Sequence, residues 1–372
     1  MRRDNNQQAF FALVRAGLWE KDVQLLPYGD IDFNEIYRLA EEQSVIGLVA
    51  AGLEHVLDIK VPKGIKLQFV GDALQLEQHN KTMSDFIGFI VGKMGDEGIY
   101  TLLVKGQGIA QCYERPLWRA CGDVDFLLNA PNYGKAKDYL KPLASSIETE
   151  GEYKQHLGMT IDSWVVELHG TLRCGLSYRM DRVIDDIQND VFFNKKVRSW
   201  MSGNTQVFLP DIDSDVIFIF THYIKHFYCG GLGIRQICDW CRLLWINKNS
   251  LNHVLLETRI KQMGLMSEWK AFAAFAVDYL GMSSEAMPLY SPKKKWACKG
   301  NRICAFVMEV GNFGHNRDNN YYAKYSYLLR KLFSLGRRCG DLMRHARIFP
   351  LDSLRFMPKI VYNGLKSAAR GE

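Results

Sequence analysis

The sequence predicts an α+β protein in which a small mixed sheet is embedded in mainly helical N- and C-terminal regions. Residues 1–99 read as helical, including a long stretch from Lys66 to Glu97. Strand-like and helix-like patterns then alternate over residues 100–210, and helical patterns return over residues 211–372. A chain of 372 residues exceeds the usual size of one core, so we expect these three stretches to form separately packed units.

The predicted sheet begins with a short apolar run, Tyr100–Val104, which stops at the glycine-containing turn Lys105–Gly108. A helix is expected from about residue 108. This order of strand, glycine turn and helix can present backbone N–H groups to an anion, and Lys105 adds a positive charge. A turn of this kind also serves for simple chain reversal, and it lacks the Gly-x4-Gly-Lys-Ser/Thr pattern of a Walker loop.

Two aspartates lie on the next predicted strand, residues 123–128. Because side chains alternate along a strand, Asp123 and Asp125 project together, whereas Val124 and Phe126 point into a core. Two like charges on a half-buried strand repel each other and lose water, and a divalent cation such as Mg²⁺ relieves both effects. The alternative is a surface strand end whose aspartates face water.

A third carboxylate, Glu167, lies further along the chain, after a helix that is predicted at residues 132–143. Strands are expected near 153–161 and 164–169, and on the second of these Glu167 and His169 share one face. If that strand lies beside the strand of the two aspartates, three acids meet at one place. Three carboxylates suit one or two metal ions that clamp the oxygens of a phosphoryl transfer. The alternative is a solvent-facing pair on an edge strand.

These motifs carry a resemblance to a known family. They read Leu103-Val104-Lys105-Gly106, Arg119-x-x-Gly122-Asp123-Val124-Asp125-Phe126-Leu127 and Val166-Glu167-Leu168-His169. Together they resemble the uncharacterised bacterial nucleotidyltransferases of the polymerase-β superfamily. The resemblance implies that Asp123 and Asp125 bind Mg²⁺ or Mn²⁺ and bridge it to the nucleotide phosphates. It implies that Glu167 completes the triad, as a ligand or as the base that takes the acceptor's proton.

The implied reaction moves a nucleoside monophosphate from a nucleoside triphosphate to an acceptor hydroxyl, with release of pyrophosphate. The candidate residues for binding the nucleotide or its phosphates are Lys105, Gly106, Gly108, Arg119 and Gly122. Lys105 and Gly106 stand where many superfamily members have Gly-Ser, so the hydroxyl that commonly contacts phosphate is missing. A catalytically weak or inactive nucleotide-binding module is therefore the alternative. The acceptor and the preferred base have no recognisable motif.

Several residues outside the acid triad have both a structural and a functional interpretation. Arg119 could contact the carboxylates or a triphosphate, or form a plain ion pair. Arg235 and Asp239 suit an ion pair between positions four apart on a helix. They lie, like His222 and His226, in a helical region that also resembles the family. Those two histidines are one helical turn apart, so they could be a surface pair, hydrogen-bonded interior residues, or accessory groups that approach the nucleotide or acceptor.

A strand is possible at Thr205–Leu209, and Pro210–Asp213 resembles a turn and N-cap before a helix at Val216–Phe227. The chain has nine cysteines, which are scattered and odd in number, so no disulfide framework is expected. Cys238 and Cys241 lack a second pair with which to bind zinc, so we expect buried free thiols there.

The composition is that of a soluble globular protein, with 47% hydrophobic and 24% charged residues. No run approaches the roughly 18–20 apolar residues that span a bilayer, so we expect no transmembrane segment and a cytoplasmic location. From Tyr290 to Glu372, 17 Lys/Arg face 5 Asp/Glu, a local charge of +12 in a chain of net charge +6. This basic region (290–372) could bind nucleic acid or another acidic surface, such as an anionic membrane. The alternative is a solvated face that balances the acidic remainder.

Overall fold

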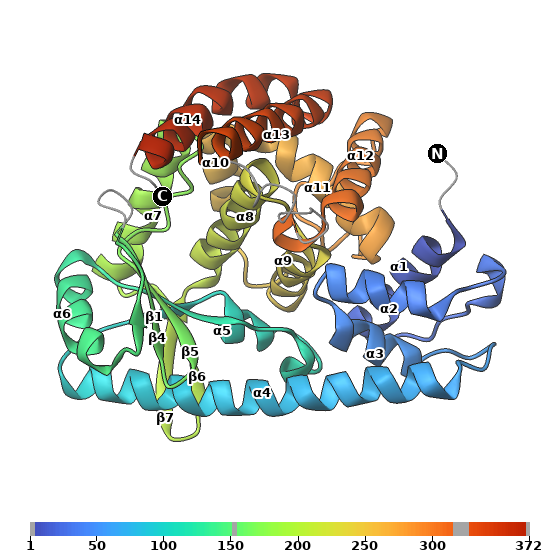
Figure 1. The fold of residues 1–372 in the computed structure, drawn as a ribbon, viewed down its shortest axis with the longest axis horizontal. Coiled ribbons are helices and arrows are strands. Elements are labelled where there is room, and N and C mark those ends of the chain that lie inside the picture. The colour runs from blue at the N-terminus through green and yellow to red at the C-terminus, as the bar shows by residue number, and fades with distance from the viewer. Residues whose placement is uncertain (1–3, 151–154, 315–326, 370–372) are drawn as a thin grey trace.

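A computed structural model describes residues 4–150, 155–314 and 327–369. It confirms the α+β class, with a five-stranded mixed sheet in the middle of a mainly helical chain (Figure 1). The N-terminal region is helical as expected, and its helices are α1 (Asn5–Trp19), α2 (Phe33–Glu42), α3 (Ile46–Glu54) and α4 (Lys63–Asp96). The division of the chain into three separately packed units stays a prediction.

The sheet has the strand order β1-β2-β5-β4-β3. Its strands are β1 (Leu102–Val104), β2 (Asp123–Leu127), β3 (Ser146–Ile147), β4 (His156–Ile161) and β5 (Trp164–His169). β2 and β5 are parallel, and the other neighbours are antiparallel. The strands expected near 100–104, 123–128 and 164–169 are confirmed. Of the strand expected near 153–161, residues 153 and 154 lie outside the described part of the chain.

Two helices connect the first strands of the sheet. α5 (Gly106–Ala110) begins two residues before the expected start and is short. α6 (Ala130–Leu140) begins where the side chain of Asn129 accepts a hydrogen bond from the backbone N–H of Asn132. It ends before the expected residue 143 because Pro142 disrupts an α-helical hydrogen-bond ladder, and the chain continues as a 3₁₀ turn, Lys141–Leu143.

A β-hairpin follows α7 (Tyr178–Phe193). The strand expected at Thr205–Leu209 is confirmed as β7 (Thr205–Pro210), but its partner β6 (Val197–Ser202) was not predicted. β6 mixes polar and aromatic residues and is partly exposed, so its hydrophobic alternation is weak. The sequence signal for β6 was the Gly-Asn pair before β7, which is a typical two-residue hairpin connection. In the structure Gly203 adopts a positive φ of 57° there.

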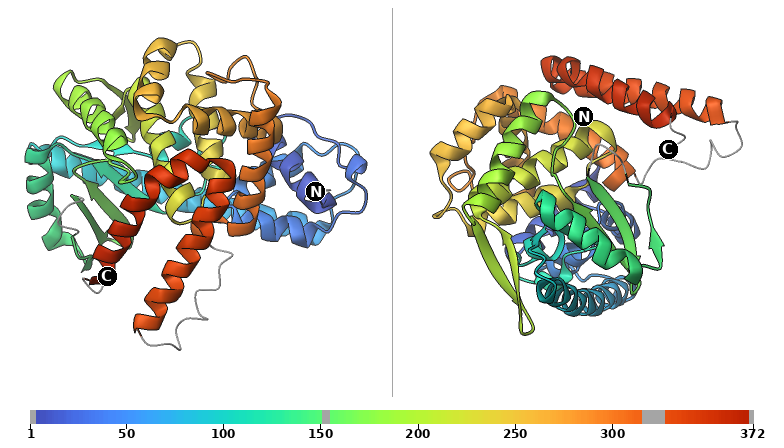
Figure 2. Two further views of the ribbon diagram at one scale, coloured as in Figure 1. Left: turned by 90° about the horizontal axis from the view of Figure 1, so that it is seen from above. Right: turned by 90° about the vertical axis from the view of Figure 1, so that its left-hand side faces the viewer.

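The remaining described elements are helices: α8 (Ile212–Cys229), α9 (Ile234–Ile246), α10 (His253–Met263), α11 (Met266–Leu280), α12 (Lys294–Val310), α13 (Tyr327–Ile348) and α14 (Pro350–Ala369). The side chain of Asp211 caps α8 as expected. Cys238 and Cys241 are buried free thiols, as predicted. Figure 2 shows α13 and α14 at the edge of the molecule, packed against each other. None of the described helices combines the length and apolar character that a bilayer crossing requires.

One face of the sheet packs on α4 and α6 and forms a compact apolar core. Val124 and Phe126 of β2 and Val166 and Leu168 of β5 are buried there, as the alternation of these strands predicts. The helical regions pack around a second, larger apolar cluster. Because one face of β2 and β5 is committed to the first core, their alternate residues, which include the acids, project from the opposite face.

Close packing between α1 and α3 depends on two glycines. A Cβ atom at Gly17 would lie 1.9 Å from the carbonyl oxygen of Leu48, and one at Gly52 would lie 2.1 Å from that of Leu13. Both obstacles are backbone atoms, so neither can move without shifting a helix. The two helices can therefore approach this closely only with glycine at both positions.

We predict that Gly17→Ala lowers the free energy of unfolding by about 1–3 kcal/mol or more, because the methyl group forces α1 and α3 apart. The matched control is Gly71→Ala in α4, where a Cβ would meet nothing within 4 Å. That substitution should raise the free energy of unfolding by up to about 1 kcal/mol, because alanine favours the helix. Urea denaturation measures both. Equal stability of the two variants would contradict the packing described here.

Candidate active site

Three carboxylates from two neighbouring strands converge on one face of the sheet. β2 and β5 pair in parallel with Asp125 opposite Glu167, and Asp123 lies two residues before Asp125 on the same face. One carboxylate oxygen from each residue lies within 4.8 Å of the other two. The expected meeting of the third acid with the aspartate pair is thus confirmed, and metal binding by the three stays a prediction.

Asp125 is the buried member of this acid cluster, and it is 1% exposed. Its Oδ1 accepts hydrogen bonds from Nζ of Lys105 at 2.7 Å and from Nε2 of His169 at 2.6 Å. Burial alone would raise the pKa of Asp125, but the charge of Lys105 and the hydrogen bond of His169 outweigh it and lower the pKa. Burial likewise opposes the charge of Lys105, and Asp125 raises the pKa of that lysine.

Glu167 is held by two imidazoles. Its Oε2 lies 3.0 Å from Nε2 of His156 and 3.3 Å from Nε2 of His169. Burial opposes ionisation of Glu167, but these two hydrogen bonds lower its pKa. His156 was not singled out from the sequence, because it belongs to no motif. The available signal was positional, since His156 lies on the strand expected directly before that of Glu167.

Asp123 is the most accessible of the three acids. The charge of Asp125, followed by burial, raises its pKa. Two carboxylates that disfavour each other's ionisation are relieved by a shared cation. Their oxygen atoms are the hard donors that Mg²⁺ and Mn²⁺ accept.

The turn before α5 brings Lys105 to this cluster in a strained conformation. Lys105 has a φ of 59° and a ψ of −145°, a region that residues with a side chain rarely adopt. Gly106 follows with a φ of 35°, and a Cβ there would lie 3.3 Å from the carbonyl oxygen of Asp123. The turn and the start of β2 are therefore in close contact.

The other two predicted phosphate-binding glycines differ in their surroundings. Gly108 faces β7, because a Cβ there would lie 2.3 Å from a methyl group of Leu209. Its lack of a side chain is thus accounted for by packing. Gly122 is exposed directly before Asp123, and a Cβ there would meet nothing within 4 Å. Phosphate binding by these glycines and by Lys105 stays a prediction.

Arg119 forms a buried ion pair. Its Nε and Nη2 donate to the two carboxylate oxygens of Asp239 at 3.0 and 2.5 Å, and the side chain is buried. Its third nitrogen donates to the carbonyl oxygen of Ala120 and to Cys121. The ion pair is thus present, and phosphate binding by Arg119 stays a prediction. The predicted pairing of Asp239 with Arg235 is wrong, because Arg119 occupies both oxygens and Arg235 donates to the carbonyl of Ala120.

The two histidines of α8 lie on the side of the acid cluster. Nε2 of His222 and Nε2 of His226 are 3.1 Å apart. Burial lowers the pKa of His222 well below its usual value, and the charges of Lys105 and His169 contribute. The structure therefore brings His222 and His226 within electrostatic reach of the site, and their accessory role stays a prediction.

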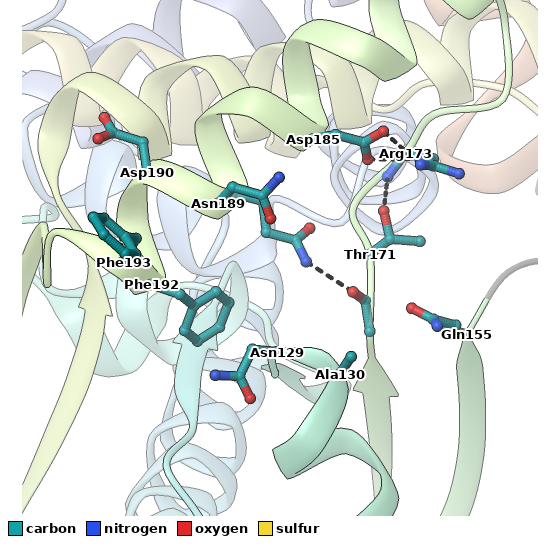
Figure 3. Close-up of a pocket in the computed structure, with 12 residues that line it drawn as sticks. Asn129, Ala130, Gln155, Thr171, Arg173, Asp185, Asn189, Asp190, Phe192 and Phe193 are labelled. Atoms are coloured by element: carbon teal, nitrogen blue, oxygen red, sulfur yellow. Dashed lines mark hydrogen bonds and ion pairs between the residues drawn. The ribbon is translucent and has the colours of Figure 1, made fainter.

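A cavity of about 1080 Å³ opens beside the ends of β4 and β5 (Figure 3). It begins at Gln155 and Gly170, the sequence neighbours of His156 and His169. Its walls come from the start of α6, the loop after β5 and α7, and its lining residues are Asn129, Ala130, Gln155, Gly170, Thr171, Arg173, Asp185, Gln188, Asn189, Asp190, Phe192 and Phe193. The amides, the hydroxyl and the two phenyl rings can contact a polar organic molecule.

The half-buried His226 of α8 predicts a pH-dependent stability. Burial, with the charges of Lys225 and Lys105, lowers the pKa of His226 to about 3 in the folded protein, against about 6.5 when unfolded. Between these values the unfolded chain binds the proton more tightly. The free energy of unfolding should therefore fall as the pH drops from about 6.5 to about 3, by up to about 1.4 kcal/mol per pH unit from this residue.

Urea denaturation of the His226→Gln variant across this range should give a shallower slope than the unmodified chain. His253→Gln, which changes an exposed histidine, should leave the slope unchanged. Equal slopes for all three proteins would contradict the lowered pKa.

Comparison with known proteins agrees with this geometry. No curated protein and no solved structure matches the chain significantly. The family model described as "Uncharacterised nucleotidyltransferase" matches residues 29–281, which include the acid cluster and the helices α8 to α11. Because this match covers more than half of the chain, the protein belongs to this uncharacterised nucleotidyltransferase family.

Proposed function

We propose that the protein transfers a nucleoside monophosphate from a nucleoside triphosphate to an acceptor hydroxyl, in a Mg²⁺-dependent reaction that releases pyrophosphate. The observation that carries the proposal is the convergence of three carboxylate oxygens within 4.8 Å, from β2 and β5. Membership of a nucleotidyltransferase family supports the general reaction. The acidic donor set supports the choice of a hard divalent cation.

Asp123, Asp125 and Glu167 would hold Mg²⁺ or Mn²⁺. The bound ion would neutralise charge on the triphosphate and help to align it. The lowered pKa values keep Asp125 and Glu167 ionised and ready to bind a cation. A lowered pKa also makes Glu167 a weak base, so we assign it to metal binding rather than to removal of the acceptor's proton.

In the proposed reaction the acceptor oxygen forms a bond to the α-phosphorus. The bond from that phosphorus to the oxygen bridging to the β-phosphate breaks, and pyrophosphate leaves with the electron pair. The hydroxyl proton passes to solvent. Lys105 would exchange its partner Asp125 for the triphosphate, since its flexible side chain carries the positive charge nearest to the cluster. This exchange would free Asp125 for the cation and supply the phosphate contact that a hydroxyl makes in other superfamily members.

We expect Asp123→Asn to lower Mg²⁺-dependent pyrophosphate release about a thousandfold, because the loss of one anionic ligand removes several kcal/mol of transition-state stabilisation. The fold should persist, since Asp123 is partly exposed. The measurement is pyrophosphate release from each of the four nucleoside triphosphates, with thermal unfolding as the check on the fold.

The control is Asp138→Asn, which removes an equal charge from an exposed position on α6 and should leave the rate unchanged. Full turnover by Asp123→Asn would overturn the proposal. Nucleotide binding without pyrophosphate release by the unmodified chain would favour the inactive nucleotide-binding module instead.

The Lys105→Met variant tests the exchange of Asp125 for the triphosphate as the partner of this lysine. We expect the variant to bind nucleoside triphosphate about tenfold more weakly, because a charge-assisted hydrogen bond is lost. Without nucleotide it should bind Mg²⁺ more tightly than the unmodified chain, because no internal cation competes for Asp125. Isothermal titration calorimetry measures both affinities. A parallel loss of both would show that Lys105 only maintains the fold of the site.

A further inference from the structure

We infer that His156, Glu167 and His169 form a second metal site, which binds a divalent transition-metal ion through two imidazole nitrogens and one carboxylate oxygen. This histidine site is distinct in chemistry from the acid cluster, although Glu167 belongs to both. The inference concerns metal binding, and it does not depend on the proposed transfer reaction.

The three side chains already face one point. His156 on β4 lies opposite His169 on β5 in the strand register, and the ring centroids are 4.8 Å apart. Oε2 of Glu167 lies 3.0 Å from one Nε2 and 3.3 Å from the other, and one ligand atom from each residue lies within 4.8 Å of the other two. Two ligands on a tetrahedral zinc ion, with bonds of about 2.0–2.1 Å, are about 3.4 Å apart. Small side-chain rotations therefore suffice to bind an ion.

The donor atoms favour transition metals over Mg²⁺. Imidazole nitrogen suits Zn²⁺ and Co²⁺, whereas Mg²⁺ takes oxygen ligands and releases its water reluctantly. Three protein ligands also leave a coordination position open for water or another ligand. His156 and Glu167 are partly exposed, with 33% and 25% of their side-chain surface accessible, so an ion can reach the site from solvent.

The two sites can be tested separately because each has a residue that the other lacks. Asp123 belongs to the acid cluster alone, and His156 belongs to the histidine site alone. Lys105 donates to Asp125 and not to a ligand atom of the histidine site. Nε2 of His169 also donates to Asp125, so it would release that proton to solvent when the ion binds. A substitution at His156 should therefore affect the transition metal and spare Mg²⁺.

The experiment is titration of the full-length chain with Co²⁺, followed by visible absorption, with Zn²⁺ as competitor. Exposed Cys229 and Cys298 are first changed to serine in all proteins, so that surface thiols do not contribute. We expect one Co²⁺ per chain, displaced by Zn²⁺ and retained in excess Mg²⁺. His156→Gln should weaken Co²⁺ binding at least tenfold, and His253→Gln, at an exposed position on α10, should not change it.

Equal Co²⁺ affinity of His156→Gln and the unmodified chain would overturn the inference, as would displacement of Co²⁺ by an equal concentration of Mg²⁺. Asp123→Asn should retain Co²⁺ binding. Co²⁺ binding by an unmodified chain that releases no pyrophosphate would remove the proposed function and leave the histidine site standing.

Discussion

Burial of the negative charge of Asp125 is the electrostatic constraint on which the site depends. The residue is 1% exposed and lies opposite Glu167 across a parallel strand pair, where two carboxylates repel and lose hydration. Lys105 and His169 compensate Asp125, and His156 shares the compensation of Glu167. Lys105 reaches this buried carboxylate from a tight turn with a strained backbone, at a φ of 59°.

Much of this site could be predicted from the period-2 alternation of two strands. That alternation placed Asp123 beside Asp125, and Glu167 beside His169, and it committed Val124 and Phe126 to the core. The pairing of the two strands was a hypothesis, because nothing in a single strand specifies its neighbour. The ion pair between Lys105 and Asp125 was equally unpredictable from the sequence. A lysine in a glycine turn can bind an anionic ligand or an internal carboxylate.

The residues that sequence reasoning misplaced depend on long-range partners. Arg119 pairs with Asp239 across 120 positions, and a local pattern favoured the nearer Arg235. His156 escaped notice because its role arises only when β4 aligns with β5. The hairpin strand β6 was missed for a different reason, since a partly exposed strand carries little hydrophobic periodicity. Local spacing thus identified the acids. Their neutralising partners could be identified only from the tertiary structure.

The long helix α4 restricts how this protein can move. It has 34 residues, about 50 Å of continuous helix, and runs beneath both the N-terminal helices and the sheet (Figure 1). It contacts α2 and α3 as well as β6 and β7. Because α4 is one continuous helix in contact with both, it prevents the N-terminal helices and the strands from hinging apart on this side of the molecule. Widening around Asp125 is thereby left to the opposite face of the sheet, where the acids project and where His222 of α8 lies within electrostatic reach of Lys105.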